Sequence, residues 1–199
     1  MRLVRQFLGL CRKAIRSWKQ SRYTPQTMAV YLRKQGAAVG NNCFIVPTDL
    51  DLEIDPRLLS IGDHVAIAAG VKFVNGQGAH LSGPGASVSC GQIVIEANCF
   101  IGIRSIIYPN VRIGPNAVVG AGSVVVSDVP PNSVVIGVPA RPFGSLEKYR
   151  DKCLQNWSEQ RPAGVTIESG ATWWSSAHLA ENRELLRRHL LRKFQKQLS

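Results

Sequence analysis

The sequence contains no apolar segment that approaches the length of a membrane span, which requires about 20 consecutive apolar residues. The apolar run at residues 7–11 is also too short for the hydrophobic region of a signal peptide, which needs about 7 to 15 residues. From these two absences we expect a protein that is neither integral to the membrane nor exported.

Paired cysteines are absent too. The five cysteines, at positions 11, 43, 90, 99 and 153, form no C-x-x-C pair and have no spacing typical of a metal site. An odd number of unpaired cysteines favours free thiols in a reducing cytoplasm. We therefore expect a cytoplasmic protein without structural disulfides, and no metal cofactor.

Acidic residues are missing from positions 1–48, which hold nine Lys or Arg. Positions 49–140 hold four bases and seven acids, and positions 141–199 hold eleven bases and six acids. The net charge of +11 thus comes from the two ends of the chain. No nucleic-acid-binding motif accompanies the basic residues, so we expect no nucleic acid partner.

A six-residue repeat dominates the middle of the chain. Each block opens on an aliphatic anchor and carries a small or β-branched residue at its fifth position. The nine anchors are Val39, Ile61, Ile67, Ile95, Ile101, Ile107, Ile113, Val119 and Val125. A period of six fits neither an α-helix nor an alternating strand. It predicts a parallel β-helix in which three blocks close one coil and the anchors face the interior.

The fourth position of the block predicts the corners of the coil. It is usually Asn, Asp or Gly, which adopt the left-handed backbone conformation at low cost. These residues are Asn42, Gly70, Asn98, Asn110, Asn116, Gly122 and Asp128, and only His64 and Arg104 depart from the pattern.

Three segments are predicted: a basic amphipathic helical segment at 1–35, the β-helix at 36–140 with an excursion loop at 74–92, and a loop and helical extension at 141–199. The first 22 residues read as a helix that covers the open end of the coil stack. Contact of this helix with an anionic membrane is the alternative. Pro130 and Pro131 are expected to end regular coiling, before a loop at 137–144, a helix through Lys148 and Cys153, and a helix at about 178–196.

Three strings, at residues 61–65, 113–125 and 134–141, resemble the hexapeptide-repeat acyltransferases with a left-handed β-helix. The nearest group is the maltose, galactoside and polysaccharide O-acetyltransferases. The left-handed winding is implied by this resemblance alone, because ordinary crossovers have the opposite hand. The resemblance further implies acetyl-CoA as co-substrate, a homotrimer with clefts between subunits, and a sugar hydroxyl as acceptor, plausibly in surface polysaccharide assembly.

The glycine-rich excursion at 74–92 is too long to be one coil, and such insertions in compact domains are usually functional. His80 is the only base in it. In the resembled enzymes a loop histidine at this place removes the proton of the acceptor hydroxyl, a task that suits an imidazole. The resemblance also places Ile103, Gly120 and Ala121 beside the pantetheine arm and Arg141 at a phosphate.

The sequence departs from the family at two strings. Residues 75–77 read Asn-Gly-Gln where many relatives have Thr-His-Asp, and Val126-Ser127 replaces Thr-Lys. A γ-type carbonic anhydrase would need three zinc-binding histidines, which His64 and His80 cannot supply. A non-catalytic β-helix that serves assembly or binding remains open, as does an acyltransferase for an amino sugar or serine.

Overall fold

The computed structural model describes residues 22–47, 51–52, 55–74, 76–77, 89–160, 187–188 and 191 of the 199-residue chain. The chain divides into two compact units, Met1–Glu147 and Lys148–Ser199. All of the described strands belong to the first unit. The three-segment division with boundaries after residues 35 and 140 remains a prediction.

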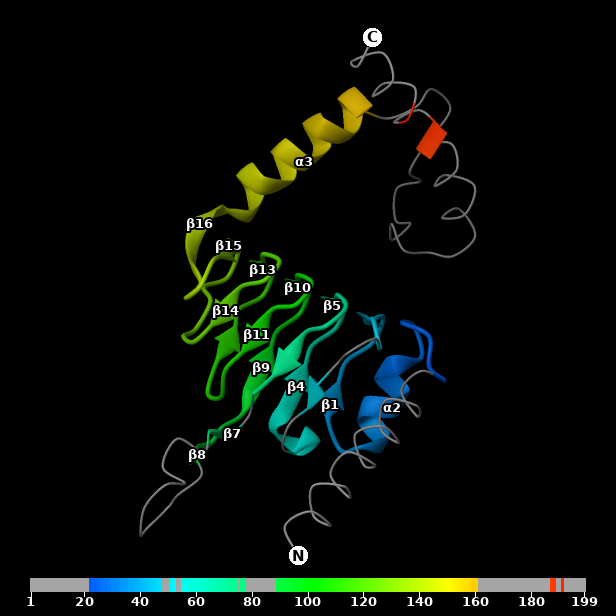
Figure 1. The fold of residues 1–199 in the computed structure, drawn as a ribbon, viewed down its shortest axis with the longest axis vertical. Helices are drawn as coiled ribbons and strands as arrows, with labels where there is room; N and C mark the ends of the chain where they lie inside the picture. The colour runs from blue at the N-terminus through cyan, green and yellow to red at the C-terminus, as the bar shows by residue number, and fades with distance from the viewer. Residues whose placement is uncertain are drawn as a thin grey trace, which may run out of the picture. The chain divides into compact units, whose positions relative to one another are not determined.

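The strands form three parallel sheets, which are the three sides of a β-helix (Figure 1). Side one holds β1 (Ala38–Val39), β4 (Leu59–Ile61), β9 (Ile93–Ile95) and β12 (Arg112–Ile113). Side two holds β2 (Phe44–Ile45), β5 (Ala66–Ile67), β10 (Phe100–Ile101), β13 (Val118–Val119) and β15 (Ser133–Ile136), with β16 (Arg141–Ser145) antiparallel at its edge. Side three holds β3 (Asp51–Leu52), β6 (Lys72–Phe73), β11 (Ile106–Ile107) and β14 (Val124–Val125).

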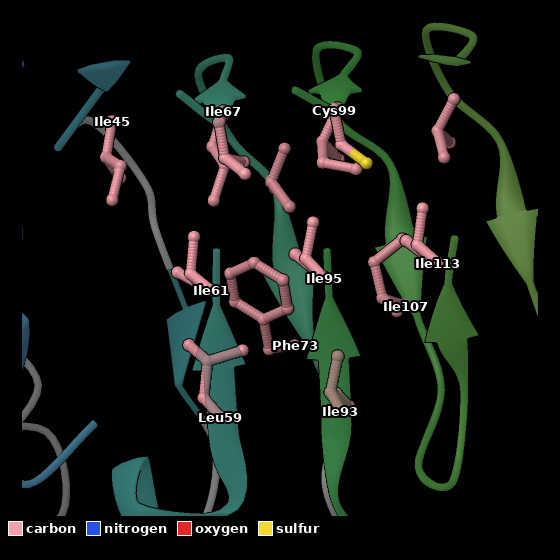
Figure 2. Close-up of a cluster of buried hydrophobic side chains, with 14 of the residues drawn as sticks. Ile45, Leu59, Ile61, Ile67, Phe73, Ile93, Ile95, Cys99, Ile107 and Ile113 are labelled. Carbon is pink, nitrogen blue, oxygen red and sulfur yellow. The ribbon is translucent and has the colours of Figure 1, made fainter. Parts of the chain in front are cut away.

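The strand register confirms three blocks per coil. Ile101 pairs with Val119 on side two, and Ile107 pairs with Val125 on side three. Each anchor therefore stacks on the anchor three blocks later, as the six-residue period predicts. The interior is one continuous apolar column, in which Phe73, Ile61, Ile95 and their neighbours gather between the sheets (Figure 2).

The corners confirm most of the fourth-position prediction. His64 and Arg104, the two departures from the pattern, still adopt the left-handed conformation, with φ of 56° and 57°. The prediction is wrong for Asp128, which is not among the residues with positive φ. Its carboxylate instead accepts a hydrogen bond of 2.8 Å from the backbone N–H of Arg112, and Asn132 takes the left-handed conformation with φ of 54°.

The fifth-position residues face the interior, and the polar ones among them form hydrogen bonds there. The Ser105 hydroxyl donates to the Gly102 carbonyl at 2.8 Å, and the Cys99 thiol donates to the Gly114 carbonyl at 3.1 Å. Burial raises the pKa of Cys99 to about 11 and raises the pKa of Cys43. Cys43 and Cys99 are therefore core residues with little thiolate at neutral pH.

Alkylation provides a test of this burial. We expect iodoacetamide at pH 8 to modify the exposed Cys90 and Cys153 in the native protein, while Cys43 and Cys99 react only after denaturation. Peptide mass spectrometry with and without guanidinium measures the difference. Native labelling of Cys99 at the rate of Cys153 would contradict the inward orientation of the fifth position.

Helix α2 (Met28–Lys34) covers the first coil. It buries Met28 and Leu32, the Arg33 Nε donates to the Val39 carbonyl at 2.8 Å, and the Ile45 N–H donates to the Pro25 carbonyl at 2.9 Å. This helix lies within the segment 1–35 that was predicted to be helical, although its own bounds were not predicted. The helix expected over the first 22 residues lies outside the described residues except for its last position, so its roles remain predictions.

The C-terminal end of the β-helix differs from expectation. Pro130 and Pro131 do not end the coil, because they occupy a corner, and β15 continues side two in parallel to β13. The expected loop at 137–144 is also partly wrong, since β16 turns back and pairs antiparallel with β15. Helix α3 (Leu146–Gln160) then confirms the helix predicted through Lys148 and Cys153.

Helical structure is also present at residues 187, 188 and 191, and the rest of the predicted helix at about 178–196 lies outside the described residues. In the part of the chain that the structure describes, no helix is long and apolar enough to span a bilayer.

Candidate functional site

Three of the residues predicted to bind the acyl donor lie on one corner, where side two turns into side three. Ile103 lies on one level of this corner, and Gly120 and Ala121 lie on the next. The Gly122 N–H donates to the Ile103 carbonyl at 2.8 Å and so joins the two levels. We call residues 102–104 and 120–122 the donor corner.

The two levels of the donor corner are in close contact. A Cβ added to Gly102 would lie 2.6 Å from the Ala121 nitrogen and 2.7 Å from the Gly120 carbonyl carbon. A side chain at position 102 would therefore push the upper level away. The donor corner can form only because position 102 is glycine.

Arg141 reaches the same corner through strand pairing. It is the partner of Ile136 in the β15–β16 pair. Ile136 in turn covers Gly120, where an added Cβ would lie 2.5 Å from Ile136 Cγ2. The structure thus brings Ile103, Gly120 and Ala121 together and links them to the exposed Arg141 through Ile136.

Most backbone groups of the donor corner are already used within the β-helix. The Gly120 N–H donates to the Val135 carbonyl at 2.8 Å, and its carbonyl accepts from the Ser105 hydroxyl at 3.0 Å. Within the described part of the chain, no hydrogen bond joins the backbone of Ala121 to another group. Ala121 is also exposed, so a ligand amide can reach its peptide groups.

His80 lies outside the described residues, but the base of its loop is described. Strands β7 (Gly76–Gln77) and β8 (Ser89–Cys90) pair antiparallel and form the stem of the excursion. The chain leaves the coil after β6 on side three and returns to β9 on side one. The excursion therefore starts at the corner where side three turns into side one.

The donor corner and the base of the excursion lie at opposite edges of side three. The outward positions of this side include Ile106 and Val124, both half-buried, and Tyr108, which packs against the core. The exposed Lys72, the strand partner of Ile106, also lies at an outward position, so the face that separates the two parts of the predicted site is apolar at its later levels only. His64 lies at the third corner, between sides one and two, so it belongs to neither part.

The structure also shows functional candidates that the sequence reasoning did not single out. Ile136, Val138 and Phe143 are exposed by 40%, 72% and 64%, and they lie in the chain segment that carries Arg141. The sequence feature that could have identified them is their position within or just after residues 134–141, the string that carries the family resemblance. Among the described residues, no group of three or more His, Cys, Asp or Glu side chains could hold a metal ion.

Comparison with protein families and curated proteins gives several matches. The family model "Bacterial transferase hexapeptide (six repeats)" matches residues 92–127. The chain is 44% identical over 130 residues to Protein CapG of Staphylococcus aureus, a match that covers 63% of this chain and 75% of CapG. It is 42% identical over 102 residues to the galactoside O-acetyltransferase of Escherichia coli K12, a match that covers 50% of this chain and 49% of that protein.

Comparison with solved structures gives a hexapeptide-repeat acetyltransferase of Vibrio cholerae O1 biovar eltor, crystallised with acetyl coenzyme A. The TM-score is 0.51 at 35% identity, and the match covers 56% of this chain and 61% of that chain. The chain therefore spans three quarters of CapG and about half of the galactoside enzyme. The predicted left-handed β-helix of hexapeptide repeats is confirmed.

Proposed function

Because this chain belongs to the hexapeptide-repeat acyltransferase family, we propose that it transfers the acetyl group of acetyl-CoA to a hydroxyl group of a saccharide. The observation that carries this proposal is the donor corner, where two contacting levels of backbone and one exposed arginine meet. Acetyl-CoA needs both features, since its pantetheine arm carries amides and its nucleotide carries phosphates. The acetyl-CoA complex of the related Vibrio cholerae protein supports the choice of donor.

The chemistry requires a base, and His80 is our candidate. Its imidazole accepts the proton of the acceptor hydroxyl while the oxygen attacks the thioester carbonyl. When the carbon–sulfur bond breaks, the imidazolium returns this proton to the CoA sulfur. The acetyl ester and the free thiol are the products, and the imidazole is regenerated. A histidine suits both transfers because its ordinary pKa lies near neutral pH.

We further propose that the site is completed in a homotrimer. Within one chain the donor corner and the base of the excursion lie at opposite edges of side three. A neighbouring subunit packed on this side would bring its own excursion to the donor corner. The half-buried Ile106 and Val124 on this side support such a contact, because they are the apolar surface that an interface buries. Analytical ultracentrifugation measures the oligomeric state.

The acceptor can be identified by measuring thiol release from acetyl-CoA against a panel of sugars, nucleotide sugars and serine. We expect turnover with a saccharide hydroxyl and none with serine. The galactoside O-acetyltransferase among the relatives supports a sugar acceptor for this chain. A role in surface polysaccharide assembly extends that proposal. Binding of acetyl-CoA without turnover on any acceptor would instead favour a non-catalytic binding protein.

We also propose a cytoplasmic location, with contact of the basic N-terminal segment with the inner membrane surface as the alternative to its role as a cover of the coil stack. The free Cys90 and Cys153, both exposed, support a reducing compartment. Sedimentation with anionic vesicles at low and high salt tests the membrane contact, since a charge-driven association weakens as salt rises.

Replacing Arg141 by alanine is expected to weaken CoA binding about tenfold to a hundredfold, because a charge-assisted contact to a phosphate is lost. Arg141→Lys should restore part of the affinity, since the charge returns without the planar guanidinium. Isothermal titration calorimetry with CoA measures both variants. An unchanged dissociation constant for Arg141→Ala would rule out the contact.

A further inference from the structure

Three apolar side chains are exposed where the donor corner ends. Ile136, Val138 and Phe143 are exposed by 40%, 72% and 64%. The neighbouring Val134 and Val135 are only 2% and 3% exposed, so apolar residues of the same segment are buried while these three are not. A group of exposed apolar side chains of this kind is typical of a binding surface.

Phe143 is exposed because of an irregularity in the strand pair. Val135 pairs with Pro142, and Val134 pairs with Gly144, so Phe143 is an extra residue without a partner on β15. Such a β-bulge redirects the side chain of the bulged strand, and bulges are frequent beside binding sites. The bulge places an aromatic ring at the surface, two residues after Arg141.

We propose that the adenine ring of acetyl-CoA stacks on the Phe143 ring. This proposal rests on the proposed function. A ligand that satisfies this surface must combine a flat apolar ring with an adjacent anionic group. Two residues of chain span at most about 7 Å, so the Phe143 ring and the Arg141 guanidinium can be engaged by one ligand. In CoA the adenine ring and the 3′-phosphate are attached to the same ribose.

Position and charge favour this occupant over a second copy of the chain. Phe143 lies two residues after Arg141, which pairs with Ile136, and Ile136 covers Gly120. The ring therefore belongs to the strand that adjoins the residues predicted to bind the pantetheine arm. Arg141 makes one described hydrogen bond, to the Ala140 carbonyl at 3.3 Å, and so has donors left for a phosphate.

The test compares ligands with and without the adenine ring. Isothermal titration calorimetry is carried out on the wild type, Phe143→Ala and Phe143→Trp, with CoA, 3′,5′-ADP and S-acetylpantetheine. We expect Phe143→Ala to bind CoA and 3′,5′-ADP about tenfold more weakly, from the usual strength of base stacking. Binding of S-acetylpantetheine should stay unchanged, and Phe143→Trp should bind CoA as tightly as the wild type.

A matched control is Val30→Ala, which removes another exposed apolar side chain, on α2 at the opposite end of the β-helix. It should leave all three affinities unchanged. Equal affinities of Phe143→Ala and wild type for CoA would overturn the role of Phe143 while the proposed function stands. Equal weakening of S-acetylpantetheine, or a change in oligomeric state by ultracentrifugation, would assign the ring to the shape of the corner or to a subunit contact. A wild type that binds neither CoA nor 3′,5′-ADP would refute both proposals.

Discussion

Replacing His80 by alanine is expected to lower the rate of acetyl transfer about 10²- to 10⁴-fold, the usual contribution of a general base. The affinity for CoA should remain unchanged, because this variant keeps Ile103, Gly120, Ala121 and Arg141, the residues proposed to bind the donor. The measurement is thiol release from acetyl-CoA at saturating acceptor, with the dissociation constant of CoA determined in parallel. A loss of kcat without loss of donor binding identifies a residue that acts in the chemical step.

His64→Asn serves as the control for this experiment. His64 is exposed and has φ of 56°, a conformation that asparagine also adopts readily. This variant should therefore keep both its stability and its activity. If His80→Ala retains turnover close to that of the wild type, the base must be sought elsewhere, and if His64→Asn is inactive, the assignment of the two histidines must be reversed.

Replacing Gly102 by valine is expected to lower the free energy of unfolding by about 3 kcal/mol and to reduce CoA binding at the same time. The new Cβ would lie 2.6 Å from the Ala121 nitrogen and 2.8 Å from the Val119 carbonyl oxygen, and both are backbone atoms of the next coil. Backbone in a stacked coil cannot yield as a flexible side chain would, so the two levels of the donor corner must separate. Urea unfolding and calorimetry with CoA measure the two effects.

Gly122→Asn is the matched control on the same corner. Gly122 has φ of 67°, and an added Cβ there would meet no atom within 4 Å. Asparagine tolerates this conformation, so the variant should lose less than about 1 kcal/mol of stability. If Gly102→Val unfolds at the same urea concentration as the wild type, the coils are not stacked as tightly as the structure shows. The two levels of the donor corner would then not be in close contact.

The sequence was sufficient to predict the repeating part of the fold, because each block contains the residue types that set its local conformation. An inward anchor, a left-handed residue and a small inward residue are all local properties, and they were correctly read at positions such as Ile101, Asn116 and Ser105. Even Arg104 takes the corner conformation, although arginine is not among the residue types enriched there, whereas histidine at position 64 is. The N–H groups of His64 and Arg104 donate to carbonyls of the preceding coil, at Asn41 and Ala69, both at 2.9 Å, which helps to hold the two residues at the corner.

The sequence-based prediction failed where contacts with distant residues, and not the local residue pattern, decide the structure. Asp128 was read as a left-handed corner residue, but its carboxylate bonds to the backbone of Arg112 in the preceding coil. The loop expected at 137–144 becomes β16 because the last strand of side two offers unpaired backbone groups. Helix α2 lies in the segment predicted to be helical, but its bounds were not predicted, since the first coil that it covers lies beyond its own sequence.

By itself the sequence determined the period of the coil, the inward column and the location of the interruption that carries His80, because all three follow from the order of residue types along the chain. Only the tertiary structure decided that Ile103, Gly120 and Ala121 meet at one corner and that Arg141 pairs with Ile136, which covers Gly120. It also placed Phe143 in a bulge beside them. That arrangement depends on the stacking of one coil upon the next and on the antiparallel pairing of β16 with β15. Both involve residues far apart in the sequence, so the local pattern of one hexapeptide does not determine them.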